Sequence, residues 1–158
     1  MYLVGMPGTG KSSVGRVLAD RLSRPFVDLD EEIEAAAGRS VQTIFAEGGE
    51  VQFRELETAA LSRISARNTA VVACGGGIVI APDNRTLMKA SGTVVWLNIS
   101  PDRLRERDLA GRPLLAEPGD LERLLKEREP FYREVADIEL DADADPEAVA
   151  TALEGLIG

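Results

Sequence analysis

The sequence predicts an α/β domain in which helices flank a parallel β-sheet. Short apolar runs typical of strands alternate along the chain with stretches of helical periodicity, which is the pattern of doubly wound folds. Residues 69–74 are apolar almost throughout, which indicates a central strand buried on both faces. A chain of 158 residues can bury a substantial core, so we expect residues 1–158 to form a single domain.

Five segments are predicted to be strands. They are residues 1–4, 25–30, 69–74, 93–98 and 137–141. The last one alternates polar and apolar residues, which is typical of an edge strand. In the second one Asp28 and Asp30 stand two residues apart, so both carboxylates are expected to leave one face at the carboxyl end of the strand. Ligands of α/β proteins bind at that end of the sheet.

Helices are predicted between the strands from apolar spacing and from residues that start or stop a helix. They are expected at residues 11–23, 30–37, 41–46, 50–66 and 82–91, over a short stretch from 100 to 107, from 120 onward, and at 146–157. Asp30 is a good helix start, since acidic residues follow it. Gly48 and Gly49 separate two of the helices, and Pro130 is expected to kink or end the one that contains it.

Composition excludes several classes of function. The formal net charge of −9 would repel a nucleic-acid backbone, so no nucleic-acid partner is expected. No window approaches the roughly 18 apolar residues of a membrane span, and the chain enters a strand at once, so we expect no membrane segment, no signal peptide and a cytoplasmic location. The sequence contains no histidine, so a catalytic proton acceptor must be a carboxylate, a lysine or a water. Cys74, the single cysteine, is expected to be buried and unreactive.

The stretch from Gly5 to Ser12 fits the phosphate-binding pattern G-x-x-x-x-G-K-[ST]. It lies between a predicted strand and a predicted helix, as the pattern requires. Its glycines let successive backbone N–H groups approach an anion at the helix N-terminus. The residues expected to bind a nucleotide here, ATP or GTP, are Gly8, Thr9, Gly10, Lys11, Ser12 and Ser13. Lys11 would reach the β- and γ-phosphates, and the Ser12 hydroxyl would bind Mg²⁺. A glycine-rich turn without a ligand is the alternative interpretation.

Further residues indicate phosphoryl transfer to a small hydroxyl compound. Asp30 is placed to accept a hydrogen bond from an attacking hydroxyl and to take its proton late. Arg54 offers a fork that matches a carboxylate. Arg112 lies in an irregular segment, residues 108–119, which is expected to be a mobile lid that excludes water and brings Arg112 over the transferring phosphate. Two alternatives stay open at this point. One is that Asp30 is only a helix cap, and the other is that Arg54 belongs to a solvated stripe with Glu57 and its neighbours.

The central strand ends in Cys74 and three glycines rather than in the aspartate that often holds Mg²⁺ in phosphate-loop proteins. The acidic partner for the metal must then come from elsewhere, and Asp28 is the nearest candidate. Gly75, Gly76 and Gly77 indicate a place where backbone meets ligand without intervening side chains. A loose connector is the alternative.

Six segments resemble, in their order and spacing, the shikimate kinase family. They are Gly5 to Ser13, Asp28-Leu29-Asp30, Phe53-Arg54-Glu55-Leu56-Glu57, Cys74-Gly75-Gly76-Gly77, Arg112-Pro113-Leu114-Leu115 and Arg128-Glu129-Pro130-Phe131-Tyr132. The phosphate loop is shared by many families, whereas the other five segments together are specific. The resemblance covers nearly the whole chain. It implies a three-layer fold of the nucleoside-monophosphate-kinase type with a five-stranded parallel sheet and a lid, and ATP-dependent phosphorylation of the 3-hydroxyl of shikimate in aromatic amino-acid biosynthesis.

The resemblance also implies roles for individual residues. Asp30 would hold the substrate diol and act as the base, and Arg54 and Arg128 would grip the shikimate carboxylate with Glu57 orienting them. The glycines at 75, 76 and 77 would line the substrate site, with Phe45, Phe53, Pro113 and Leu114 as apolar walls. Lys11 and Arg112 would contact the transferring phosphate, while Ser12 directly and Asp28 through water would hold Mg²⁺. Residues 30–60 would form the substrate-binding segment. Shikimate is the expected small-molecule partner, and the protein is expected to be a monomer.

Two points depart from the family pattern or stay open. Members often carry an arginine near the adenine before the last helix, whereas residues 142–145 here are Ala-Asp-Ala-Asp, so adenine contact there would come from backbone. Spacing does not decide whether Arg105 or Arg107 stacks on the base. The rival interpretations are a kinase of another small metabolite, such as gluconate, and a nucleotide-binding protein that has lost catalysis.

Overall fold

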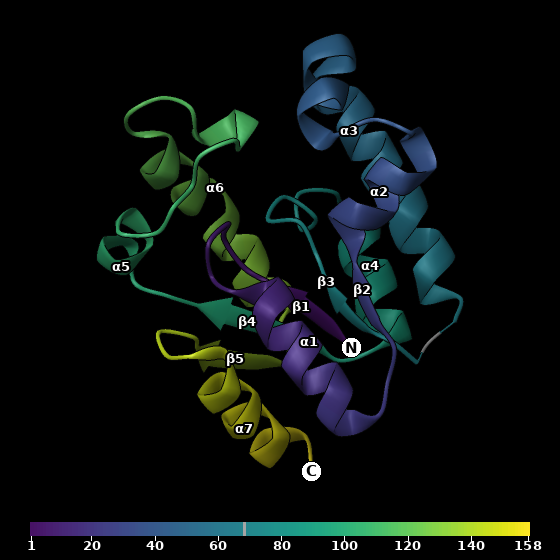
Figure 1. Ribbon diagram of the computed structural model, residues 1–158, viewed down its shortest axis with the longest axis vertical. Helices are drawn as coiled ribbons and strands as arrows, with labels where there is room; N and C mark the ends of the chain where they lie inside the picture. The colour runs from purple at the N-terminus through teal and green to yellow at the C-terminus, as the bar shows by residue number, and fades with distance from the viewer. Residues whose placement is uncertain (68) are drawn as a thin grey trace.

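The structure is a computed structural model that describes residues 1–67 and 69–158. A five-stranded parallel sheet with the order β2-β3-β1-β4-β5 forms the middle layer. Its strands are β1 (Tyr2–Val4), β2 (Phe26–Asp28), β3 (Val71–Ala73), β4 (Val94–Asn98) and β5 (Ile138–Asp141). Helices flank the sheet on both sides (Figure 1), which confirms the predicted fold class.

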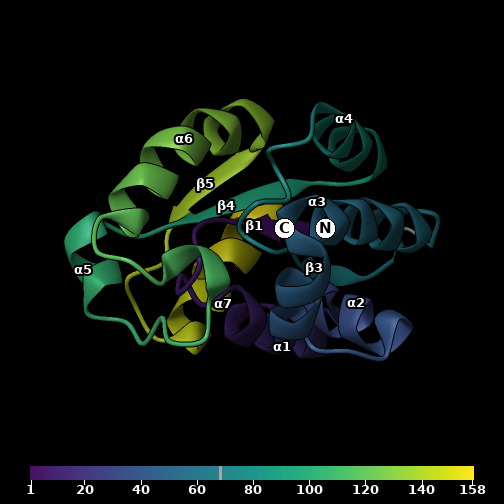
Figure 2. The ribbon, with the colours of Figure 1, turned by 90° about the horizontal axis from the view of Figure 1, so that it is seen from above.

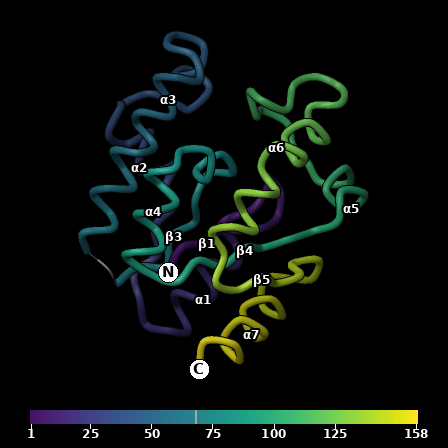
Figure 3. The backbone as a smooth tube through the Cα atoms, turned by 180° about the vertical axis from the view of Figure 1, so that it is seen from behind, coloured from purple at the N-terminus to yellow at the C-terminus, as the bar shows by residue number. Residues whose placement is uncertain are grey.

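Seven α-helices and one 3₁₀ turn are found in the described ranges. They are α1 (Lys11–Leu22), α2 (Leu29–Ala37), α3 (Val41–Ser65), α4 (Pro82–Ser91), α5 (Pro101–Arg105), η1 (Pro113–Leu115), α6 (Asp120–Val135) and α7 (Pro146–Ile157). Seen from above, α1 and α7 cover one face of the sheet, and α4 and α6 cover the other (Figure 2). The view from behind shows α4 and α6 in front of the strands (Figure 3). This is the three-layer arrangement expected from the alternation of strands and helices.

The middle strands of the sheet are buried, which explains why their residues are apolar without alternation. β1 lies between β3 and β4, and every residue of β1 and β3 is buried. β5 lies at one edge and alternates between exposed and half-buried residues, so the predicted edge strand is confirmed. Cys74, directly after β3, is buried as expected, and burial raises the pKa of its thiol.

The prediction for Asp28 and Asp30 was wrong in its geometry. The strand ends at Asp28, and Asp30 lies in the first turn of α2 rather than on the strand. Asp28 is the helix cap, since its side chain accepts hydrogen bonds from the backbone N–H groups of Asp30 and Glu31 at 3.1 and 3.4 Å. The capping hydrogen bonds occupy one oxygen of Asp28, and the Asp30 side chain takes no part in capping the helix.

The two glycines in the α3 region act as predicted. Gly49 has φ 70° and ψ −172°, so α3 consists of two helical segments joined at this residue. Pro130, in contrast, does not end its helix, because α6 continues to Val135. No helix in the described part of the chain is both long and apolar enough to cross a membrane.

Candidate active site

Two cavities lie side by side where the strands end. The phosphate-loop cavity has a volume of about 340 Å³ and is lined by Pro7, Gly8, Gly10, Lys11, Ser12, Ser13, Asp28, Asp30, Ala73, Cys74, Gly75, Gly76, Arg107, Asp108 and Arg112. The arginine cavity, of about 300 Å³, is lined by residues of α2, α3, the glycine triplet, the 111–115 segment and α6, among them Arg54, Arg112 and Arg128. The two cavities share Pro7, Asp30, Gly75, Gly76 and Arg112. A ligand in one cavity would therefore meet a ligand in the other at Asp30 and Arg112.

The phosphate loop is shaped by close backbone contacts. Gly5 has φ +146°, and a Cβ at this position would stand 2.4 Å from the Leu97 carbonyl oxygen, so only glycine fits. The Lys11 ammonium group donates to the carbonyl oxygens of Gly5 and Met6 at 2.9 and 2.8 Å. Burial, and next to it Arg112, lowers the pKa of Lys11 to about 8, so the side chain is still mostly cationic at neutral pH.

Ser12 and Asp28 stand together at the side of the phosphate-loop cavity. The Ser12 hydroxyl donates to Asp28 Oδ2 at 2.5 Å. Because its proton already points to the carboxylate, the lone pairs of the Ser12 oxygen are available to a cation. One hydroxyl and one carboxylate fit Mg²⁺, which is commonly held by one or two carboxylates together with substrate phosphates and water. Among the described residues, no cluster of three or more Asp, Glu or Cys side chains could hold a metal ion.

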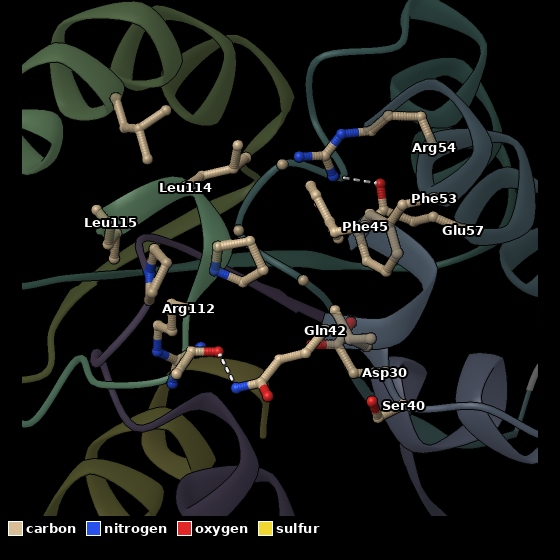
Figure 4. Close-up of a pocket in the computed structure, with 18 of the residues that line it drawn as sticks. Asp30, Ser40, Gln42, Phe45, Phe53, Arg54, Glu57, Arg112, Leu114 and Leu115 are labelled. Carbon is tan, nitrogen blue, oxygen red and sulfur yellow. Dashed lines mark hydrogen bonds and ion pairs between the residues drawn. The ribbon is translucent and has the colours of Figure 1, made fainter. Parts of the chain in front are cut away.

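Asp30 is half-buried at the junction of the two cavities (Figure 4). Its Oδ1 atom is buried and has no hydrogen-bond partner in the described part of the chain. Burial and the neighbouring Asp28 raise the pKa of Asp30, while the positive charges of Lys11 and Arg112 oppose this shift. A carboxylate that lines both cavities beside two cations is suited to accept a hydroxyl proton.

Arg54 and Glu57 form the far side of the arginine cavity. Both come from α3, and Arg54 donates to Glu57 Oε1 at 2.8 Å, as the dashed line in Figure 4 shows. The Glu57 side chain is 0% exposed, and burial raises its pKa to about 7 although Arg54 opposes the shift. The alternative of a solvated stripe is therefore excluded for Glu57, since the carboxyl group is fully buried and its Oε2 has no partner among the described residues.

The glycine triplet leaves room for side chains of the site. A Cβ on Gly75 would stand 2.8 Å from Glu57 Oε2, and one on Gly77 would stand 2.2 Å from Arg54 Nη2. A Cβ on Gly76 would stand 3.0 Å from Arg128 Nη1. None of the three glycines has a positive φ, so close approach rather than backbone conformation requires them. The sequence predicted that a ligand meets the backbone here without intervening side chains. In the structure the side chains of the site lie against the three glycines, and contact with a ligand stays a prediction.

Arg128 reaches the arginine cavity from α6. It is only 2% exposed, and its Nε atom has no hydrogen-bond partner among the described residues. A buried guanidinium group with an unpaired donor is costly unless an anion completes its hydrogen bonding. Arg54 and Arg128 approach neighbouring glycines of one loop, so the two arginines face a common space.

The predicted lid, residues 108–119, covers the side of both cavities. Gly111, Arg112, Pro113, Leu114 and Leu115 line the arginine cavity opposite Phe45 and Phe53 of α3. The Gln42 side chain donates to the Gly111 carbonyl at 2.8 Å, which joins α3 to the segment that carries Arg112 (Figure 4). Gln42 was not among the predicted residues, because nothing in its spacing links it to the lid. The mobility of the lid stays a prediction.

The structure distinguishes Arg105 from Arg107, between which the spacing did not decide. Arg107 lines the phosphate-loop cavity, whereas Arg105 pairs with Glu122 and Asp102 outside it. Asp143, from the loop where an arginine was noted as missing, pairs with Arg103 and Arg107 at 2.9 and 3.7 Å. Arg107 is thus the one of the pair that borders the nucleotide side of the site.

The comparison with known proteins agrees with the family resemblance of the six sequence segments. Residues 7–156 match the family model described as shikimate kinase. The chain is 48% identical to the shikimate kinase of Synechococcus sp. (strain CC9605), over 97% of this chain and 79% of that protein. It is 45% identical to the shikimate kinase of Symbiobacterium thermophilum, over 90% of this chain and 86% of that protein.

Solved structures extend the comparison. The shikimate kinase of Acinetobacter baumannii in complex with shikimate superposes with a TM-score of 0.94 and 39% identity, over 99% of this chain and 90% of that one. A gluconokinase of Sinorhizobium meliloti superposes with a TM-score of 0.63 at 23% identity, over 99% of this chain and 90% of that one, which shows a shared fold alone.

Proposed function

Since the chain belongs to the shikimate kinase family, we propose that it transfers the γ-phosphoryl group of ATP to the 3-hydroxyl of shikimate. The products are shikimate 3-phosphate and ADP, in the route to chorismate and the aromatic amino acids. The junction of the two cavities carries this proposal, because Asp30 and Arg112 border both of them. Both cavities are formed within one chain, so the enzyme can act as a monomer. Its proposed location is the cytoplasm, where ATP is available.

ATP places its phosphates in the phosphate-loop cavity. The backbone N–H groups at the start of α1 and the Lys11 ammonium group neutralise the β- and γ-phosphates, with Gly8, Thr9, Gly10 and Ser13 completing the cradle. To do so, Lys11 exchanges its bonds to the Gly5 and Met6 carbonyls for phosphate oxygens. Ser12 and Asp28 would hold Mg²⁺, which would supply positive charge to the phosphate oxygens.

Shikimate occupies the arginine cavity with its carboxylate toward Arg54 and Arg128. The two guanidinium groups supply donors that match a carboxylate, and Glu57 holds Arg54 in place through the bond at 2.8 Å. Gly75, Gly76 and Gly77 give main-chain contacts, while Phe45, Phe53 and Leu114 flank the ring. The carboxylate anchors one end of the substrate and leaves its hydroxyls near Asp30.

Asp30 receives the proton of the attacking hydroxyl. The hydroxyl oxygen forms a bond to the γ-phosphorus, the bond from that phosphorus to the β–γ bridging oxygen breaks, and ADP leaves with the electron pair. Proton transfer occurs late in a loose transition state, so a carboxylate is basic enough. Lys11 and Arg112 stabilise the charge on the transferring oxygens, and residues 108–119 close over the site to exclude water.

A substrate panel tests the assignment. ADP formation is coupled to NADH oxidation with shikimate, gluconate and nucleoside monophosphates as acceptors, each with ATP and MgCl₂. We expect shikimate-dependent turnover that exceeds the rate with every other acceptor by orders of magnitude, and a product phosphorylated at the 3-hydroxyl by ³¹P and ¹H NMR. Equal rates with gluconate, or no acceptor-dependent turnover at all, would defeat the proposal.

A further inference from the structure

We propose that Tyr132 is a positioning residue for the acceptor, because its hydroxyl fixes the peptide unit between Gly76 and Gly77 in one of two possible orientations. The identity of the acceptor in this inference rests on the proposed function. Tyr132 is 0% exposed and does not line either cavity, so it acts through the glycine loop rather than by touching a ligand.

Tyr132 is rigidly held in the core. Its ring stacks on Trp96 with a centroid distance of 5.8 Å and an interplanar angle of 25°. The hydroxyl donates to the Gly76 carbonyl oxygen at 2.5 Å and lies 3.8 Å from Met6 Sδ, a residue of the phosphate loop. Burial raises the pKa of Tyr132, although the neighbouring Arg128 guanidinium opposes the shift, so the hydroxyl keeps its proton and remains a donor. Tyr132 therefore ties α6 to the glycine loop at a point between the two cavities.

The glycine loop is a turn whose central peptide can flip. The Ile78 N–H donates to the Gly75 carbonyl at 3.1 Å, which makes Gly76 and Gly77 the two central residues of a β-turn. Type I and type II turns differ mainly in the orientation of the peptide between these two residues, and type II needs a positive φ at the second. Gly77 can adopt that conformation but does not in the structure. Without a further contact, a turn with two central glycines has no strong preference.

The Tyr132 hydroxyl supplies that contact. In a trans peptide the C=O and the following N–H point in opposite directions, so the bond from Tyr132 to the Gly76 carbonyl directs the Gly77 N–H away from Tyr132. Gly77 lies beside the Arg54 guanidinium, as the 2.2 Å approach of a Cβ shows. The Gly75 and Gly77 carbonyls are also bonded, to the N–H groups of Ile78 and Ile80. Within the described ranges, the three glycine N–H groups have no acceptor, so this loop has donors to offer an anion.

If the peptide between Gly76 and Gly77 flipped, it would offer the ligand a hydrogen-bond acceptor instead of a donor. It would turn the Gly76 carbonyl oxygen toward the space between Arg54 and Arg128, where the acceptor carboxylate binds. A carbonyl oxygen repels a carboxylate and competes for the guanidinium donors, whereas an N–H attracts it. Tyr132 thus sets the affinity for the acidic acceptor through a peptide that faces the two arginines, although Gly76 also borders the phosphate-loop cavity.

The test removes one oxygen atom. Tyr132→Phe keeps the ring stacked on Trp96, and Tyr2→Phe is the matched control, because the buried Tyr2 hydroxyl bonds Ser91 Oγ at 2.7 Å near the amino ends of the strands. We expect Y132F to raise the KM for shikimate about 5- to 30-fold, the change that corresponds to about 1–2 kcal/mol, with the KM for ATP within about twofold of wild type. Y2F should leave both values unchanged.

A second readout needs no turnover. The ¹H–¹⁵N spectrum of the protein without ligands should show a shifted or broadened Gly77 amide signal in Y132F and an unchanged one in Y2F. If Y132F alone proves too unstable to purify, the pair G155A and G155A/Y132F is measured instead, since Gly155 lies in α7 with no atom within 4 Å of an added Cβ.

The outcomes separate this inference from the proposed function. Parallel rises in both KM values, a fall in kcat alone, or an unchanged Gly77 amide would overturn the role of Tyr132. Wild-type enzyme that ignores shikimate would instead overturn the proposed function, and the amide signal would then decide whether Tyr132 fixes the glycine peptide.

Discussion

The two cavities are built in different ways. The phosphate-loop cavity takes its largest group of lining residues from one contiguous segment, residues 7–13, where the start of a helix offers backbone N–H donors. The arginine cavity is assembled from side chains of α2, α3, the lid segment and α6, which are far apart in sequence. A site of the first kind depends on local glycine conformations, whereas a site of the second kind depends on the whole fold and on buried charges that hold long side chains in place.

The largest effect is expected where the two cavities meet. Asp30→Asn keeps the size of the side chain but removes its ability to accept a proton, so kcat should fall about 10²- to 10⁴-fold while the KM for ATP changes little. Steady-state kinetics with varied ATP and varied shikimate would measure this. Asp20→Asn, an exposed change on α1, is the control and should leave both parameters unchanged.

Near-normal turnover of D30N would mean that the cavities meet without Asp30 taking a proton. A tenfold or greater rise in the KM for ATP would place Asp30 in the phosphate-loop cavity alone. Either result would remove the junction on which the comparison of the two cavities depends.

The contrast between the cavities also explains what could be predicted from the sequence. The phosphate loop was complete in the sequence, because eight consecutive residues between a strand and a helix define its geometry. The fold class followed from apolar runs and helical spacing. Asp28 as the true cap of α2 was missed, because a capping Asp and an Asp two residues later are equally compatible with the same pattern.

The arginine cavity needed more than local patterns. Arg54 and Arg128 were named together only through the family resemblance, since 74 positions of chain separate them and each alone resembles a solvated helix residue. The burial of Glu57 and the bond from Gln42 to Gly111 depend on how α3 packs against the glycine triplet and the lid. Tyr132 belongs to the last segment of the family resemblance, but no role was implied for it. Its position four residues after Arg128 places both on one face of α6.

Glu57 allows the arginine cavity to be tested through its dependence on pH. Burial raises the pKa of Glu57 from its ordinary value near 4.5 to about 7, so between these values the folded protein holds a proton that the unfolded chain has released. Stability should therefore fall as pH rises from about 4.5 to about 7, by at most about 3 kcal/mol from this group. Glu57→Gln cannot titrate and should lose this part of the decline.

Urea unfolding of wild type and E57Q at several pH values between 5 and 8 would measure the difference. Taking the difference between the two profiles cancels the titration of the exposed carboxylates that both proteins share. A constant difference across this range would show that Arg54 compensates the buried charge fully. Protonation of Glu57 would then make no contribution to the pH dependence of stability.

The smallest effects should distinguish the two cavities most cleanly, through glycine-to-alanine changes. Gly8 has φ +85°, and a Cβ there would lie 2.9 Å from the Leu109 side chain, so Gly8→Ala strains the phosphate loop. A Cβ on Gly77 would displace the flexible Arg54 guanidinium rather than backbone. We expect G8A to raise the KM for ATP and G77A the KM for shikimate, each by roughly tenfold, which is about 1.4 kcal/mol.

Gly155→Ala is the matched control for both variants. An added Cβ meets no atom within 4 Å and the residue lies in α7, so G155A should leave both KM values unchanged and stabilise the fold by about 0.5–1 kcal/mol. Kinetics with each substrate varied in turn, together with thermal unfolding, would measure all three variants. If G8A and G77A changed the same KM, backbone geometry in one cavity would control binding in the other. The cavities would then be one cooperative site, because their shared residues Pro7, Gly75 and Gly76 would transmit the strain.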